Sequence, residues 1–148
     1  MSAIRQRWSA ILDAEVAAGE PPARHLEALR IPKLEGWESG RVWMTWTVDA
    51  DLTTPMGPVF GGYLAALADH VMACALFTVL EDHETFSTSD LHANFLHPVR
   101  SGRVEIEALV INRSERAAAC ETRFSDTSGR LLVRAVATQA IRSRPHGA

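Results

Sequence analysis

The sequence predicts a single α+β domain: one long central helix wrapped by a curved antiparallel sheet of five to six strands, with an extra N-terminal helix. Two patterns carry this prediction. A continuous apolar run of helical length lies near the middle of the chain, and segments in which apolar and polar residues alternate flank it. A chain of 148 residues, of which 47% are hydrophobic, can bury one sizeable core but is short for two.

The first segment, residues 1–32, is predicted to be a helical extension. Its apolar residues recur at the spacing of one helix face and stop at the helix-breaking stretch GEPP. They are Ile4, Trp8, Ile11, Leu12 and Val16. Leu26 and Leu29 mark a second short turn. We interpret the extension as a lid or brace on the domain that follows.

Residues 33–142 are predicted to form that domain, beginning with two strands. Val42, Met44 and Trp46 alternate with polar or amphipathic neighbours, and the stretch ESG before them supplies a turn. A hairpin fits this pattern best. No repeat or linker interrupts the domain, and residues 143–148 are expected to be a flexible tail.

The next segment, from Gly57 to Leu76, is predicted to be a long helix. It is apolar on all sides, so we expect other elements to cover it all round. The apolar run from Tyr63 to Leu80 contains Asp69, His70 and Thr78 and lacks flanking anchor residues. A buried helix therefore explains it better than a membrane span.

Up to four strands are predicted after the helix, separated by the turn sequences HPVRSG, NRSER and DTSGR. Their expected ranges are 85–96, 103–112, 117–126 and 130–141. Within the second, Val104, Ile106 and Ala108 lie on one face while Glu105 and Glu107 lie on the other. This alternation is typical of a half-buried antiparallel strand.

Composition and motif content exclude several classes of function. The net charge of −3 and the scattered arginines do not favour a nucleic-acid partner. Cys74 and Cys120 suggest reduced core thiols, and the N-terminus lacks a secretory pattern, so we expect a cytoplasmic protein. His92 and His97 lack the spacing of metal ligands, and no serine or cysteine nucleophile motif is present.

The order of these elements, together with spaced motifs, resembles the hotdog-fold thioesterases. The motifs are G-x-x-x-G-G at the helix start, an aspartate seven residues after the last glycine, and F-L-x-P-V-x-x-G after a strand. The resemblance extends from Gly36 to Ile141 and is greatest to the PaaI-like acyl-CoA thioesterases of the phenylacetic-acid-degradation type. It implies hydrolysis of acyl-CoA by a homodimer or dimer of dimers, with composite sites at the subunit seam, no metal and no organic cofactor.

Carried over by position, the resemblance implies three catalytic residues. Asp69 matches the helix carboxylate that acts as nucleophile or general base, and Gly61 matches the glycine whose N–H polarises the thioester carbonyl. Thr88 matches a position where a hydroxyl assists. Two positions differ from the commonest family pattern: Phe60 stands where histidine is usual, and Thr54 stands where an amide residue helps to hold the substrate.

The residues themselves suit this chemistry. Gly61 and Gly62 bring bare backbone to a helix N-terminus, where N–H groups lack intrahelical partners. A donor placed where negative charge develops on oxygen contributes roughly 3 kcal/mol. Asp69, in an apolar setting, is poorly solvated and hence more reactive than an exposed aspartate. Each feature also has a structural explanation: a tight helix start for the glycines, and structural hydrogen bonds for the aspartate.

Geometry favours a site shared by two chains. Gly62 and Asp69 are seven residues apart, which is about 10 Å along a helix axis. A thioester carbon within roughly 3 Å of Asp69 could hardly place its oxygen at the donor of the same chain. We therefore expect Asp69 of one chain to face the Gly61 N–H of a second chain whose helix runs antiparallel.

Several residues keep two interpretations. On strict alternation Thr88 lies with Asp90, so either a bulge intervenes or that polar face lines the seam. Arg100, Arg113 and Arg116 either bind the CoA phosphates or are solvated turn residues. The aromatic residues Phe60, Trp43, Trp46 and Tyr63 either narrow an acyl pocket or belong to the core.

His70 lies about 100° from Asp69 around the helix, so we expect a core or interface histidine rather than a substrate-orienting one. Two other functions remain open. The differences at Phe60 and Thr54 favour a non-catalytic binding protein for acyl-CoA or an acyl carrier. A hotdog dehydratase is a weaker alternative, because His70 is badly oriented to serve it.

Overall fold

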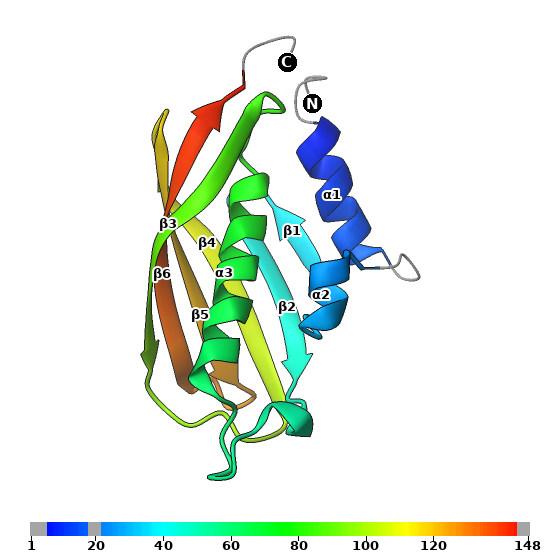
Figure 1. Cartoon of the computed structure of the whole chain (residues 1–148), viewed down its shortest axis with the longest axis vertical. Helices are drawn as coiled ribbons and strands as arrows, with labels where there is room; N and C mark the ends of the chain where they lie inside the picture. The colour runs from blue at the N-terminus through cyan, green and yellow to red at the C-terminus, as the bar shows by residue number, and fades with distance from the viewer. Residues whose placement is uncertain (1–5, 18–21, 145–148) are drawn as a thin grey trace.

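The computed structural model describes residues 6–17 and 22–144. One six-stranded antiparallel sheet, in the order β1-β2-β4-β5-β6-β3, curves around the long helix α3 (Figure 1). The helices are α1 (Gln6–Val16), α2 (Arg24–Ala28) and α3 (Gly61–Phe77), with a short 3-10 turn at Ala50–Leu52. The strands are β1 (Gly36–Glu38), β2 (Arg41–Thr47), β3 (Glu84–Phe95), β4 (Arg103–Arg113), β5 (Ala117–Asp126) and β6 (Leu131–Ser143). The predicted α+β architecture is confirmed.

The strands bury the faces that their alternation predicts. In β2, Val42, Met44 and Trp46 are buried while the residues between them are only partly covered. The β1–β2 turn contains Gly40 at φ 81°, a conformation that glycine adopts without strain. Of the predicted tail, residues 145–148 lie outside the described residues, and Ser143 is the last residue of β6. No helix in the described ranges is both long and apolar enough to cross a bilayer.

Helix α3 differs from the expectation in one respect. Its face toward the sheet is fully buried and includes Leu67, Val71 and Met72. Its opposite face, which carries Ala66 and Ala73, is only half-buried. A helix that is apolar all round is therefore covered on one side by its own sheet, while α1 and α2 cover only part of the other side (Figure 1).

Helix α1 of the N-terminal extension packs against the C-terminal end of α3, which corresponds to a brace rather than a lid. The Trp8 ring of α1 stacks on Phe77 with centroids 4.9 Å apart, and its Nε1–H donates to the Glu81 carbonyl at 2.8 Å. Lys33 Nζ donates to the Ala17 carbonyl at the end of α1 at 2.9 Å. Trp8 thus fixes α1 against the domain by both stacking and hydrogen bonding.

Candidate active site

The clearest polar contact at the site joins α3 to the edge strand β3. The Thr88 hydroxyl donates a hydrogen bond to Oδ1 of Asp69 at 2.8 Å. Both side chains are half-buried, so the pair is accessible from the outside without being fully solvated. The structure therefore brings together two of the three residues that the resemblance implies are catalytic.

A β-bulge explains how Thr88 reaches the helix. The pairing of β3 with β6 shifts between Thr88 and Asp90, so that Thr88 faces Gln139 and Asp90 faces Thr138. Two consecutive residues, Ser89 and Asp90, are consequently exposed, and Thr88 turns to the inner face. Of the two interpretations that the sequence allowed for Thr88, the bulge is confirmed.

Gly61 and Gly62 begin α3 without a side-chain cap. Phe60 occupies the cap position and makes no side-chain hydrogen bond to the helix. Its ring packs over the second glycine, where an added Cβ on Gly62 would lie 2.5 Å from Phe60 Cε2. Among the backbone bonds of the described turns and loops, none has the Gly61 N–H as donor, whereas the Phe60 N–H donates to Leu52 O at 3.2 Å. The Gly61 N–H is therefore available to an incoming acceptor.

The loop before α3 is held in place by its own backbone bonds. The Thr54 N–H donates to the Pro58 carbonyl at 2.8 Å, and the Gly57 N–H donates to Thr54 O at 2.9 Å. Arg100 crosses this loop and donates to the Met56 carbonyl at 3.3 Å. Thr54 and Arg100 therefore lie at the same end of the molecule as the start of α3.

Gly61 and Asp69 border different hollows of the single chain. A hollow of about 310 Å³ is lined by Gly61, Leu64 and Phe95, and an added Cβ on Gly61 would lie 3.2 Å from the Phe95 ring. A second hollow, of about 360 Å³, is lined by Asp69 and Ala73 together with residues of α1 and α2. Eight residues separate Gly61 from Asp69, or about 12 Å along the axis.

His70 packs into a polar cluster beside Asp69. Its Nε2 lies 3.8 Å from Oε2 of Glu15 and 3.6 Å from Sγ of Cys74. Burial lowers the pKa of His70 to about 4, and burial likewise raises the pKa of Glu15. The distance between His70 and Glu15 alone would suggest an ion pair. At 3.8 Å, however, the cost of burying a charged imidazole exceeds its attraction to the Glu15 carboxylate. The imidazole of His70 is therefore neutral near pH 7.

The three arginines named from the sequence do not meet. Arg100 lies near the N-terminus of α3, whereas Arg113 ends β4 and Arg116 lies in the following turn, toward the C-terminal end of α3. Arg113 forms an ion pair with the buried Glu84. Arg116 lines a surface hollow with Arg142. One chain can therefore offer Arg100 beside Gly61 but not all three arginines together.

The aromatic residues divide between the core and the outer face of the sheet. Trp46 and Tyr63 are buried, and the Tyr63 hydroxyl donates to the Arg30 carbonyl at 3.0 Å. Trp43 lies on the far side of the sheet, where Arg41 stacks on its ring at 4.4 Å. Only Phe60, which is half exposed, remains beside the candidate site.

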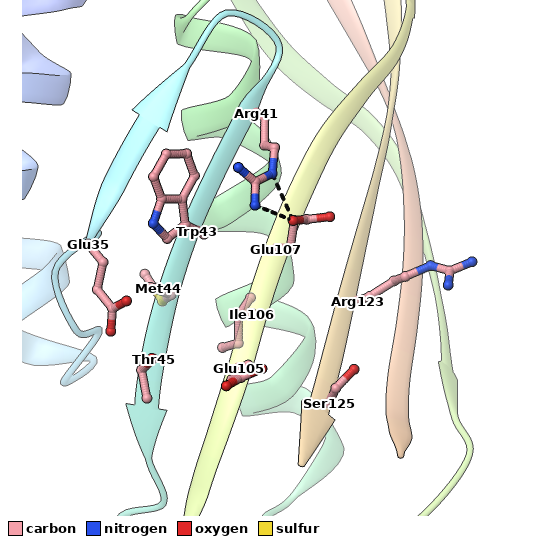
Figure 2. A pocket seen from close by; sticks show the side chains of 10 residues that line it. All are labelled: Glu35, Arg41, Trp43, Met44, Thr45, Glu105, Ile106, Glu107, Arg123 and Ser125. Carbon is pink, nitrogen blue, oxygen red and sulfur yellow. Dashed lines mark hydrogen bonds and ion pairs between the residues drawn. The ribbon is translucent and has the colours of Figure 1, made fainter. Parts of the chain in front are cut away.

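The outer face of the sheet carries a hollow of about 400 Å³ over β2, β4 and β5. Arg41 and Glu107 form an ion pair there at 2.7 Å (Figure 2). Trp43, one of the aromatic residues considered for an acyl pocket, lines this hollow, but none of the catalytic candidates does. Within the described ranges, no three His, Cys, Asp or Glu side chains come together as metal ligands would.

One buried group near the site was missed by the sequence interpretation. Gln139 of β6 is directly opposite Thr88 and is fully buried, yet neither of its amide atoms has a hydrogen-bond partner among the described residues. In a strand where apolar and polar residues alternate, a glutamine is normally interpreted as an exposed polar residue. Only its position between Ala137 and Ile141 on the apolar face could have signalled its burial.

Comparisons with known proteins identify the family of the chain. The family model of the Thioesterase superfamily matches residues 56–133, which include α3, the Asp69–Thr88 pair and the Gly61 donor. A Haemophilus influenzae protein named "Putative esterase" is 39% identical over 75 residues, which are 49% of this chain. The match spans 54% of the length of that relative.

Solved structures show the same fold over most of the chain. A thioesterase from Haemophilus influenzae superposes with a TM-score of 0.74 at 26% identity, covering 84% of this chain and 87% of the neighbour. A phenylacetic acid degradation-related protein from Ralstonia eutropha gives a TM-score of 0.75 at 26% identity, covering 90% of this chain and 98% of its own. The chain belongs to the thioesterase superfamily and has its hotdog fold.

Proposed function

We propose that the protein is a cytoplasmic, homo-oligomeric acyl-CoA thioesterase that hydrolyses its substrate to a free carboxylic acid and CoA. The observation that carries the proposal is the Thr88–Asp69 hydrogen bond at 2.8 Å, on the same helix that begins with the Gly61 donor. The superfamily membership supports the reaction class. The choice of CoA as the thiol rests on the resemblance of the sequence motifs to the PaaI-like acyl-CoA thioesterases.

The proposed chemistry assigns one task to each residue. Thr88 holds Oδ1 of Asp69 and thereby directs the other carboxylate oxygen toward the substrate. That oxygen either attacks the thioester carbon itself or takes a proton from the water that attacks it. The carbonyl oxygen gains negative charge, which the Gly61 N–H and the positive end of α3 stabilise. The C–S bond then breaks and the sulfur leaves as the CoA thiol, taking the proton that Asp69 removed from the attacking water. Where Asp69 itself attacks, the sulfur takes its proton from solvent, and a water molecule then hydrolyses the acyl–aspartyl anhydride, which releases the carboxylic acid and restores the Asp69 carboxylate.

Two chains are required in this proposal. The Gly61 donor and the Asp69 carboxylate of one chain are about 12 Å apart along the axis, too far to act on one carbonyl group. A twofold-related copy with an antiparallel α3 would place its Gly61 beside Asp69. The edge position of β3 and the half-buried outer face of α3 leave both elements available for such a copy.

Substrate binding is proposed to begin at the N-terminal end of α3. Phe60 and Gly62 adjoin the donor glycine in the chain, and Thr54 and Arg100 lie in or beside the loop that precedes it. A guanidinium group there suits the CoA phosphates. Arg113 and Arg116 lie at the other end of α3, so they could serve this phosphate site only from the second chain.

The deciding assay measures thiol release from a panel of acyl-CoA substrates. The Asp69→Asn variant is expected to lose at least about a hundredfold in kcat, with substrate affinity changed little, because the amide can neither attack nor accept a proton. The matched control is Asp90→Asn, which alters an exposed carboxylate on the same strand as Thr88. Turnover by Asp69→Asn equal to that of the control would refute the proposal.

A second candidate function rests on Phe60. Its ring packs against Gly62 at the donor end of the helix, where a polar ring is usual in the resembling family. A binding protein for acyl-CoA would show saturable affinity for every ligand tested and hydrolyse none of them. The same panel therefore separates this candidate from the thioesterase.

A further inference from the structure

A groove lies between the N-terminal helices and the half-buried outer face of α3, and Asp69 is one of its lining residues. Its volume is about 360 Å³, and we call it the helix groove. The residues that shape it are Ile11 of α1, Leu26, Leu29 and Ile31 of the α2 region, and Ala73 and Phe77 of α3. An engineered cavity of about 150 Å³ holds a benzene molecule, so the helix groove has room for a larger apolar group.

An aromatic ring in a fixed position lines the helix groove at the C-terminal end of α3. Phe77 stacks on Trp8 with centroids 4.9 Å apart and meets the edge of Phe86 at 5.5 Å. From Asp69 to Phe77 is eight residues, or about 12 Å along the axis. An extended chain advances by roughly 1.2 Å per bond, so the groove accommodates about ten bonds. Ala73 lies midway, where its small side chain leaves the groove open.

Charge decides which arm of an acyl-CoA substrate suits the groove. The carboxylates of Asp69 and Glu15 line it, and they would repel phosphates. The imidazole of His70 is neutral near pH 7 because burial lowers its pKa to about 4. The hollow beside Gly61 differs: Arg100 lies beside it, and Arg130 contacts the lining residue His97 at 2.8 Å.

We infer that the helix groove holds the acyl group of the thioester and that the protein therefore prefers medium-chain acyl groups of about six to ten carbons. The inference rests on the proposed thioesterase function. The CoA arm lies over the Gly61 hollow of one chain, and the acyl group enters the helix groove of the chain that supplies Asp69. The N-terminal helices, through Trp8 and the groove residues of α1 and α2, set the length of acyl chain that fits.

The test uses CoA thioethers, which lack the carbonyl group and are not hydrolysed. Dissociation constants of S-ethyl-CoA and S-decyl-CoA are measured by calorimetry. The wild-type protein is expected to bind the decyl thioether at least about tenfold more tightly, since each buried methylene contributes up to about 0.8 kcal/mol. Ala73→Phe places a ring across the groove and is expected to reduce this length preference at least about tenfold.

Two further variants keep the test decisive. Leu29→Ala removes an apolar wall from a residue that is 45% exposed, so the fold is kept, and the length preference should fall about threefold. Ala10→Phe adds the same ring on the exposed face of α1, outside the groove, and should leave the preference unchanged.

The inference would be overturned by equal wild-type affinity for both thioethers, by no detectable binding of either, or by an Ala73→Phe preference equal to that of Ala10→Phe. If Ala73→Phe weakens the binding of both thioethers equally, the inference is also contradicted. That result would indicate that a contact between subunits, and not the acyl group, fills the groove. A wild-type preference for decyl that Ala73→Phe abolishes, without hydrolysis of any acyl-CoA, supports the groove and rejects only the thioesterase.

Discussion

Replacing the buried glutamine of β6 should stabilise the protein. Gln139 is fully buried, and neither its Oε1 nor its Nε2 finds a partner among the described residues. Leaving such a group unpaired costs about 1–3 kcal/mol, which an apolar side chain of similar length would not incur. Gln139→Met is therefore expected to raise the free energy of unfolding by about 1–3 kcal/mol. For a domain of this size, the gain corresponds to roughly 2–12 °C in Tm.

The assay is unfolding in guanidinium chloride, followed by far-UV circular dichroism and tryptophan fluorescence at one fixed protein concentration. A fixed concentration matters because association of subunits also shifts apparent stability. Gln139→Glu serves as the opposite control, since a carboxylate at the same position would be buried without a partner and should destabilise the fold. A lower midpoint for Gln139→Met would show that the amide is hydrogen-bonded and would refute the reasoning.

Three further changes test other contacts. Thr88→Val removes the hydroxyl that donates to Asp69 and should lower kcat about tenfold, whereas Thr88→Ser should retain most of the activity. His70 has a pKa of about 4 when folded against 6.5 unfolded, so only the unfolded chain takes up its proton as pH falls through 6.5. Unfolding titrations should therefore show roughly 3 kcal/mol of stability lost between pH 6.5 and 4, a loss that His70→Asn removes. Arg113→Met leaves the buried Glu84 carboxylate without its cation and should cost about 3 kcal/mol in denaturant unfolding.

For each of these three predictions, a specific result would contradict the reasoning. Equal kcat for the valine and serine variants would show that the Thr88 hydroxyl has no role. An acid dependence that His70→Asn leaves unchanged would assign the loss to other groups, and Glu15 beside it is the first to test. For Arg113→Met the comparison is Arg41→Met, which breaks the more exposed pair with Glu107. If both variants lose a similar amount of unfolding free energy, burial does not make the Arg113–Glu84 pair more important than the exposed one.

Much of the fold could be predicted because the spacing of the apolar residues along the sequence matches the positions that the structure buries. The buried residues Val42, Met44 and Trp46 repeat every second position, and Gly61–Phe77 is apolar except at Asp69 and His70. Both patterns indicate how many faces of a helix or strand pack against other parts of the protein. The expected complete covering of α3 was wrong for one chain, because hydropathy does not say whether a missing side is covered by the same chain or by another.

The site was harder to predict because its contacts join distant parts of the chain. Asp69 and the helix-start glycine stand out locally, but the inward turn of Thr88 depends on a bulge that only the pairing with β6 reveals. Arg113 could not be assigned to Glu84 from sequence, since 29 residues separate them. Strand alternation gives the face of a residue but not its partner across the sheet.

The irregularity in β3 also bears on which other chains can bind along this strand. A long edge strand exposes a row of backbone donors and acceptors to which any extended peptide could add, and this is a common start of fibre formation. The extra residue at Ser89 breaks the even spacing of that row. A regular foreign strand would lose register there, whereas a second copy of this chain, related by a twofold axis, brings the same break to the interface. In the proposed dimer, the residue that turns the Thr88 hydroxyl inward would therefore also favour pairing with a second copy over aggregation.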